Sequence, residues 1–332
     1  MISRQRAWNA QAAVRPAFRF LFHSLVFLCA LALMGGCGRT KAGADASSPQ
    51  APAEIWKEFS ADKAWEFTKT QIEFGPRPAG SEALVKTRAY ILENLQKAGW
   101  DVEQQKFNDE TPRGPVAFVN LIARFPAAPG KPAATDTQQV IIASHYDTKL
   151  FDTIKFLGAS DGASSTGALM EMARVLALDP AMARKVELVF FDGEEAVEQF
   201  TTTDGLYGSR YYARQLRTSK RNEQFKFGIL WDMIGKKNVT ITLPPDSPAE
   251  LAKGIFEASD ALKLRAHFTY LDRDLLDDHI PLNESHIPTI DLIDFDYMYW
   301  HTADDLLDKL SPESLQITGS VTLYYLKQRL AK

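Results

Sequence analysis

Acidic and imidazole side chains recur in five short segments that lie far apart in the sequence. Two imidazoles and three carboxylates form a mixed nitrogen and oxygen set, which suits one zinc ion or a pair of zinc ions that share a carboxylate. An acid that binds no metal, such as Glu194 beside Glu195, can carry a proton instead. The sequence therefore predicts a metal-dependent enzyme. The candidate metal-binding residues are His145, Asp161, Glu195, Asp232 and His301.

Several of these candidates follow apolar runs that have no polar alternation. Such runs are usually strands buried on both faces, as in a mostly parallel sheet with helices on each side. In open α/β sheets, ligands bind beyond the carboxyl ends of the strands. We therefore expect His145, the pair Glu194 and Glu195, and Asp232 to meet at one edge of a sheet. The three runs are residues 139–144, 186–191 and 226–231.

The rest of the chain alternates between helical and strand patterns without an internal repeat. We predict one α/β domain over residues 55–332, a three-layer sandwich with a mostly parallel mixed central sheet flanked by helices. Ser81 is a suitable N-cap for its second helix. The predicted helices are 56–70, 82–98, 163–178, 207–216, 248–262 and 312–329. The predicted strands, besides those above, are 116–124, 239–243 and 289–293.

Each candidate residue also has a purely structural explanation. A lone histidine after a strand is often only hydrogen bonded, and Asp161 can cap a helix that starts near residue 163. Adjacent glutamates are favourable in a solvated first turn, and Asp304 and Asp305 can be surface charges. These explanations apply one at a time. The ordered spacing and the placement at strand ends favour a common site.

The first residues predict export. Residues 1–19 contain four arginines and no acid, an apolar run over 20–33 follows, and glycines precede Cys37. We interpret residues 1–36 as a lipoprotein-type signal peptide with Cys37 as the lipidation site, and residues 37–54 as a flexible tether. The alternative is ordinary cleavage nearby, which leaves Cys37 as an incidental thiol. The expected location is the periplasm or the cell exterior, with a lipid anchor as the only membrane contact.

Composition excludes some classes of partner. Removal of residues 1–36 takes away four arginines, so the mature chain is more acidic than the full chain with its formal net charge of −4. An acidic chain without a basic cluster is a poor nucleic-acid binder. The other cysteine, Cys29, lies in the apolar run, so no intramolecular disulfide is expected. We expect a monomer.

The motifs along residues 74–326 resemble the zinc aminopeptidase superfamily and, within it, the glutaminyl cyclases. The segments Asp192-Gly193-Glu194-Glu195 and Trp300-His301-Thr302 are typical of the superfamily. Three further segments are similar to the cyclases in particular. They are residues 144–149 (Ser-His-Tyr-Asp-Thr-Lys), 206–210 (Leu-Tyr-Gly-Ser-Arg) and 277–281 (Asp-Asp-His-Ile-Pro).

The cyclase resemblance implies a peptide or protein with N-terminal Gln as substrate and pyroglutamate as product. It implies one zinc held by Asp161, Glu195 and His301, with zinc polarising the amide carbonyl that the peptide's own amine attacks. Glu194 would act as general base and then general acid. Asp278 and Asp232 would orient the amine and the leaving group. Trp300 would supply an apolar wall, and Phe200 replaces a tryptophan of animal cyclases, which leaves the pocket shape open.

Two alternatives remain. Aminopeptidases of the superfamily hold two zincs, which here would add His145 and Asp232 as ligands with Asp161 bridging, and Glu194 would activate water for hydrolysis. All of these residues are present. The second alternative is a catalytically inactive binding module, which predicts a lost ligand or a lost Glu194, and neither is lost.

Overall fold

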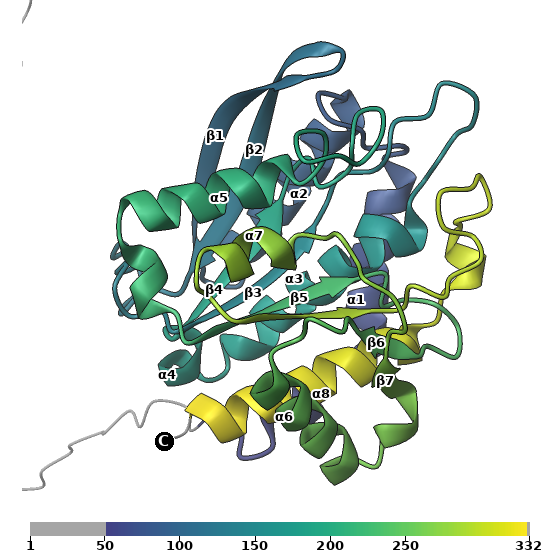
Figure 1. Cartoon of the computed structure of the whole chain (residues 1–332). Coiled ribbons are helices and arrows are strands. Elements are labelled where there is room, and N and C mark those ends of the chain that lie inside the picture. The colour runs from purple at the N-terminus through teal and green to yellow at the C-terminus, as the bar shows by residue number, and fades with distance from the viewer. Residues whose placement is uncertain (1–50, 331–332) are drawn as a thin grey trace, which may run out of the picture. The chain divides into compact units, whose positions relative to one another are not determined.

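A computed structural model describes residues 51–330 of the chain (Figure 1). The predicted signal peptide, the lipidation site Cys37 and most of the predicted tether lie outside the described residues. Between residues 51 and 330, no helix is both long and apolar enough to cross a membrane.

One eight-stranded mixed sheet forms the centre, in the order β1-β2-β4-β3-β5-β8-β6-β7. The four inner strands β4, β3, β5 and β8 are parallel to one another, whereas β1 and β2 pair antiparallel at one edge. The strands are β1 (Asp101–Thr111), β2 (Gly114–Arg124), β3 (Val140–His145), β4 (Val186–Phe191), β5 (Phe227–Asp232), β6 (Ile241–Leu243), β7 (Phe268–Tyr270) and β8 (Thr289–Ile293).

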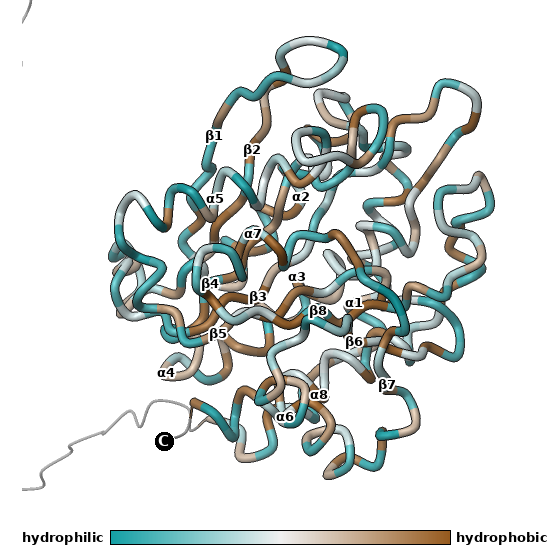
Figure 2. Tube along the Cα trace, in the orientation of Figure 1, coloured by the Kyte–Doolittle hydropathy of each residue, from teal (hydrophilic) through white to brown (hydrophobic). Residues whose placement is uncertain are grey.

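Helices cover both faces of the sheet, and alternate residues of β3 show how. Val140 and Ile142 pack into the larger core with helices α1, α2, α3, α6 and α8, while Ile141 and Ala143 pack on the other face with α5 and α7. Figure 2 shows hydrophobic residues along these central strands. The helices are α1 (Ala61–Glu73), α2 (Glu82–Lys97), α3 (Ser165–Leu176), α4 (Pro180–Ala183), α5 (Tyr207–Thr218), α6 (Ala249–Ala261), α7 (His279–Glu284) and α8 (Pro312–Leu330). The predicted fold class is confirmed.

One prediction of local structure is wrong, and strand β1, like β7 and α7, is not predicted from the sequence. The helix predicted from residue 56 is interrupted, because a short 3-10 turn (Ile55–Glu58) ends before Ser60, whose side chain caps α1 by accepting a hydrogen bond from the Lys63 N–H (3.3 Å). Strand β1 is not among the predicted strands, because most of its residues are polar and it lies at the sheet edge, where little of it is buried. The predicted Ser81 cap is confirmed, since its hydroxyl accepts from the Leu84 N–H.

Candidate metal centre and active site

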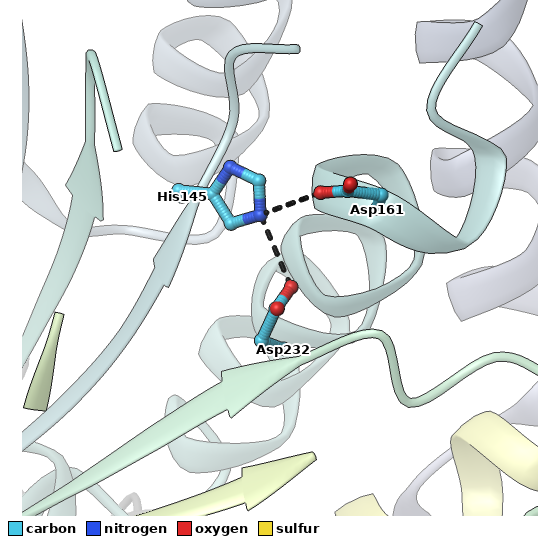
Figure 3. A group of neighbouring side chains, drawn as sticks. All are labelled: His145, Asp161 and Asp232. Atoms are coloured by element: carbon cyan, nitrogen blue, oxygen red, sulfur yellow. Dashed lines mark hydrogen bonds and ion pairs between the residues drawn. The ribbon is translucent and has the colours of Figure 1, made fainter. Parts of the chain in front are cut away.

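Each candidate metal-binding residue lies at the carboxyl edge of the parallel strands or in a loop that returns to it. His145 is the last residue of β3 and Asp232 the last of β5. Glu195 lies in the loop after β4, and His301 in the loop after β8. Figure 3 shows Asp161 and Asp232 directed at the same nitrogen of the His145 ring.

The five residues form two groups that share Asp161. In the first, His145 Nε2 lies 3.3 Å from Asp161 Oδ1 and 3.1 Å from Asp232 Oδ1. In the second, His301 Nε2 lies 3.4 Å from Asp161 Oδ2 and 3.2 Å from Glu195 Oε1. The two oxygens of Asp161 therefore face different imidazoles, as a carboxylate between two cation sites would.

These distances suit zinc. Ligand atoms about 2.1 Å from a tetrahedral ion lie roughly 3.4 Å from each other, which matches the second group. Glu195 Oε2 is buried and has no hydrogen-bond partner among the described residues. Its lone pairs are therefore available to bind a metal ion. The donor set and its spacing fit a metal ion. The first group has the same spacing, so a second ion is geometrically compatible.

Acidic neighbours raise the pKa values of both histidines of the site. Burial alone lowers the pKa of His301, but hydrogen bonds to Asp161 and Glu195 outweigh burial and raise it from 6.5 to about 10. Burial likewise opposes the charge on His145, yet its contacts with Asp147, Asp161 and Asp232 raise its pKa well above 6.5. The His301 imidazole is therefore protonated at neutral pH when no metal is bound, and a divalent cation would replace that proton.

The backbone around Asp161 suits metal binding and not helix capping. Asp161 has φ −81° and ψ 101°, so the chain is extended there, between Gly158 and the start of α3 at Ser165. Gly162 follows with φ +85°, and a Cβ at that position would come within 2.6 Å of the Asp147 carbonyl oxygen. A side chain there would displace the turn, which explains glycine directly after the ligand.

Glu194 belongs to neither metal-binding group. The Glu194 and Glu195 N–H groups donate to the two carboxylate oxygens of Asp147, at 3.1 and 3.2 Å, which fixes the loop after β4. Gly193 makes this turn at φ +72°, where a Cβ would lie 2.5 Å from the Phe118 ring. Burial, together with the charges of Glu195 and nearby aspartates, raises the pKa of Glu194 well above 4.5. A carboxyl group with a raised pKa suits proton transfer near neutral pH.

A cavity of about 260 Å³ opens beside the metal-binding groups. Both residues predicted to contact substrate line it. Trp300 stacks on His301 with ring centres 4.1 Å apart, and Phe200 lies under the Lys149 ammonium, 5.6 Å from the ring centre. The cavity therefore joins acidic groups to aromatic walls.

Comparisons with known proteins agree with this geometry. The model of peptidase family M28 matches residues 120–326, well over half of the chain. The chain belongs to peptidase family M28. Among curated proteins, the glutaminyl-peptide cyclotransferase of Dictyostelium discoideum is 29% identical over 272 residues, 69% of this chain and 75% of the relative. A cyclotransferase-like protein of Bos taurus is 29% identical over 76% of this chain and 72% of its own.

This M28 member is also similar in fold to solved structures. The glutaminyl cyclase of an Acidobacteriales bacterium superposes with a TM-score of 0.74 at 31% identity, over 85% of this chain and 97% of that one. A zinc-dependent exopeptidase from Parabacteroides distasonis superposes with a TM-score of 0.72 at 26% identity, over 83% and 99%. The chain is thus similar both to cyclases and to a peptidase.

In this M28 domain, two adjacent acids that look alike in the sequence differ in their position relative to the cavity. Asp277 lines the cavity, whereas Asp278, the residue predicted to act on substrate, is fully buried before α7 and is not among the cavity-lining residues. Burial raises the pKa of both acids, and the charges of both raise the pKa of Glu194. Of the two acids, Asp277 borders the cavity, and its carboxyl group also lies beside Asp291 and His279.

Asp305 is a further residue of the M28 site that the sequence leaves undecided. It is fully buried, unlike the exposed Asp304. Its carboxylate accepts from the N–H groups of Ser160 (2.8 Å) and Asp161 (3.2 Å) and from the Tyr297 hydroxyl (2.7 Å). Asp305 therefore holds the turn that presents Asp161, and the surface-charge explanation is wrong for it.

Arg77 is the residue that sequence reasoning missed. It appears only as part of a Gly-Pro-Arg-Pro break between helices, yet its side chain is fully buried. Its guanidinium donates to the carbonyl oxygens of Leu157 (2.8 Å), Gly158 (3.0 Å) and Tyr146 (3.2 Å). It thereby ties the segment before Asp161 to the segment after His145. An arginine between two prolines in a helix break is the only signal in the sequence.

Proposed function

We propose that this protein is a zinc-assisted glutaminyl-peptide cyclotransferase, which converts N-terminal Gln of peptides or proteins to pyroglutamate with release of ammonia. The observation that carries the proposal is a cavity in which acids outnumber those needed for one metal. Glu194 and Asp277 line it together with the ligand group. The similarity to named cyclotransferases along most of the chain supports the same reaction.

In this proposal Asp161, Glu195 and His301 would hold the zinc, which would supply Lewis-acid chemistry at the carbonyl of the substrate's side-chain amide. Glu194 accepts a proton from the substrate's α-ammonium group, so that the free amine can attack the side-chain carbon. A new carbon–nitrogen bond forms, and the bond to the amide nitrogen breaks. Glu194 passes this proton, and then the second proton that the attacking nitrogen loses, to the departing nitrogen, which leaves as protonated ammonia, so Glu194 ends as it began.

Asp232 and Asp277 lie where they can hold the two nitrogens of this reaction. Both line the cavity with Glu194. Burial raises the pKa of Asp232 to about 7, so it can accept or donate a hydrogen bond at neutral pH. We assign to these two residues the orientation of the amine and of the departing ammonia. The sequence assigned the orientation of the amine to Asp278, and the presence of Asp277 and not Asp278 among the cavity-lining residues favours Asp277.

An aminopeptidase with two metal ions is the second candidate function. The observation that favours it is the group of His145, Asp161 and Asp232, whose contacts of 3.1 and 3.3 Å match those of the other group. In that case both metal-binding groups would share Asp161, and Glu194 would take a proton from the attacking water. The similarity to an exopeptidase of known structure supports this candidate at the level of the family.

Export and lipid anchoring through Cys37 remain proposals that rest on the sequence alone. They agree with an enzyme that acts on the N-termini of exported peptides or proteins.

The test uses two tripeptides and a metal count. The purified protein, loaded with zinc, is incubated with Gln-Phe-Ala and with Leu-Phe-Ala, and the products are followed by mass spectrometry. A cyclase removes the mass of ammonia from the Gln peptide alone, faster than a control without enzyme, and holds one zinc. Release of free leucine by a protein with two zincs would support the aminopeptidase and refute the cyclase. No stoichiometric metal and no turnover would indicate an inactive binding module.

A further inference from the structure

A third cluster of buried donor atoms lies outside the two metal-binding groups. It consists of Asp277, His279 and Asp291, and we call it the α7 cluster. Asp277 lies two residues before α7, His279 is the first residue of that helix, and Asp291 is the middle residue of β8. One side-chain atom of each lies within 4.8 Å of the other two, and all three residues are at most 4% exposed. The cluster shares no residue with either metal-binding group.

Asp291 is an unexpected residue at its position in the sheet. The neighbouring residues of β8 include Ile290 and Leu292, and the whole strand is buried. A carboxyl group at such a core position is unfavourable unless it has a function. Neither carboxylate oxygen of Asp291 has a hydrogen-bond partner in the described part of the chain. A buried polar group of this kind requires a further partner, such as an ion.

The His279 ring directs a nitrogen into the α7 cluster. Its Nε2 lies 3.3 Å from Asp246 Oδ2, in the loop after β6. Asp246 is 44% exposed and so is ionised at neutral pH, and an ionised carboxylate only accepts, so Nε2 donates. His279 Nδ1 is then the nitrogen that can offer a lone pair. It is buried, has no hydrogen-bond partner within residues 51–330, and lies 3.7 Å from Asp291 Oδ2. A carboxylate that fixes the outer nitrogen of an imidazole is typical of histidines that bind metal ions.

The charges of the α7 cluster are not balanced by basic side chains. Between residues 51 and 330, no lysine or arginine pairs with Asp277 or Asp291. Two carboxyl groups side by side in the interior do not both ionise unless a cation lies with them. A divalent cation would match the charge of both carboxylates, whereas without an ion the pair has to retain a proton.

The geometry allows an ion to enter and to bind. Asp277 borders the cavity, so an ion and a water ligand can reach the cluster from there. Ligand atoms of a tetrahedral zinc lie roughly 3.4 Å apart, and the 3.7 Å between His279 and Asp291 is slightly wider. The side chains have to close in around the ion, at a cost in binding free energy. The α7 cluster should therefore fill at higher zinc concentration than the group of Glu195 and His301.

We propose that the α7 cluster is a further binding site for a divalent cation, with Asp277, His279 and Asp291 as its three protein ligands. Its mixed nitrogen and oxygen donors suit zinc, and Asp246 is a positioning residue that orients the imidazole. The site has one consequence that rests on the proposed cyclotransferase activity. Since Asp277 is assigned to a nitrogen of the substrate, an ion bound to it would withdraw that carboxylate, and excess zinc should slow cyclisation.

The test locates and counts the zinc ions. Crystals of the protein soaked in zinc chloride are measured by anomalous diffraction at the zinc edge, and we expect a peak between the three ligands of the α7 cluster. In equilibrium dialysis at rising zinc concentration, the wild-type protein should bind one ion more than Asp291→Asn. Asp246→Asn should weaken binding of that last ion about 10- to 100-fold. The matched control is Asp260→Asn, at an exposed residue of α6 that does not line the cavity, and it should bind zinc as the wild type does.

The Asp246 variant keeps the test decisive if Asp291→Asn does not fold, because Asp246 lies at the surface. A zinc peak at the group of Glu195 and His301 with none at the α7 cluster would overturn the proposal, and the two acids would then only share a proton. Equal binding of the last ion by Asp246→Asn and Asp260→Asn would also overturn it.

Turnover separates this site from the proposed function. The zinc concentration that halves cyclisation of Gln-Phe-Ala should be about 10- to 100-fold higher in Asp246→Asn than in the wild type. If both are inhibited equally, the inhibitory role of the α7 cluster is wrong. A zinc ion in the α7 cluster of a protein that cyclises no peptide at any zinc concentration would support the site and refute the cyclotransferase.

Discussion

The adjacent acids Asp277 and Asp278 allow one prediction that depends only on tertiary structure. Each is replaced by asparagine, which keeps the size of the side chain and removes its charge. Asp277 lines the cavity, whereas Asp278 is fully buried and does not. We expect Asp277→Asn to slow cyclisation strongly and Asp278→Asn to leave it nearly unchanged.

The magnitudes follow from the surroundings of each carboxyl group. A hydrogen bond between the Asp277 carboxylate and the substrate's charged amine is worth about 1.5–3 kcal/mol, which corresponds to a roughly 10- to 150-fold loss in kcat/KM. Burial raises the pKa of Asp278 well above 3.8, and the charge of Asp277 adds to this. Asp278 does not line the cavity, so its replacement removes no contact with the substrate. Its replacement by a neutral amide should change kcat/KM less than about threefold.

The assay measures ammonia release from Gln-Phe-Ala by the two variants and by the wild-type protein. Zinc content and the midpoint of thermal unfolding are measured on the same samples, so that a loss of metal or of fold is recognised. If Asp278→Asn is the slower variant while both hold zinc and stay folded, the assignment from cavity geometry is wrong. Equal losses in both variants would show that the pair acts as one unit.

Four further predictions concern the metal and the proton carrier. Glu194→Gln should lower kcat about 10²- to 10⁴-fold while zinc is retained. The control variant Glu198→Gln, at an exposed residue of the same loop, should turn over normally. Near-normal turnover of Glu194→Gln would refute the proton transfer. His301→Ala should lose zinc, as measured by elemental analysis. Asp305→Asn should weaken zinc binding about 10- to 100-fold in a chelator competition, since the turn bearing Asp161 loses its anchor, and unchanged affinity would contradict that. The pKa of His301 is raised to about 10, so zinc has to displace the proton of His301 at any lower pH. The zinc Kd should therefore fall up to about tenfold for each unit of pH increase from pH 6 to 9. A Kd that stays constant over this range would exclude the linkage.

The sequence by itself predicts the fold class and the residues of both metal-binding groups. The reason is that these signals are local. An apolar run such as 140–144 can be read as a buried strand without knowledge of its partners, and the end of a parallel strand points to the ligand-binding edge. The segments after β4 and around His301 depend on tight turns. The glycine that the first of these turns needs, Gly193, can be identified in the sequence.

Tertiary structure decided what depends on packing between distant segments. Strand β1 is polar and forms only because β2 offers hydrogen bonds along its whole length. Asp277 and Asp278 look equivalent until α7 starts and places one in the cavity and the other in the interior. Asp305 and Arg77 gain their roles from partners 144 and 81 residues away, Asp161 and Gly158. No local pattern records such partners, because hydrogen bonds to a distant backbone depend on where the chain returns and not on the residues beside it.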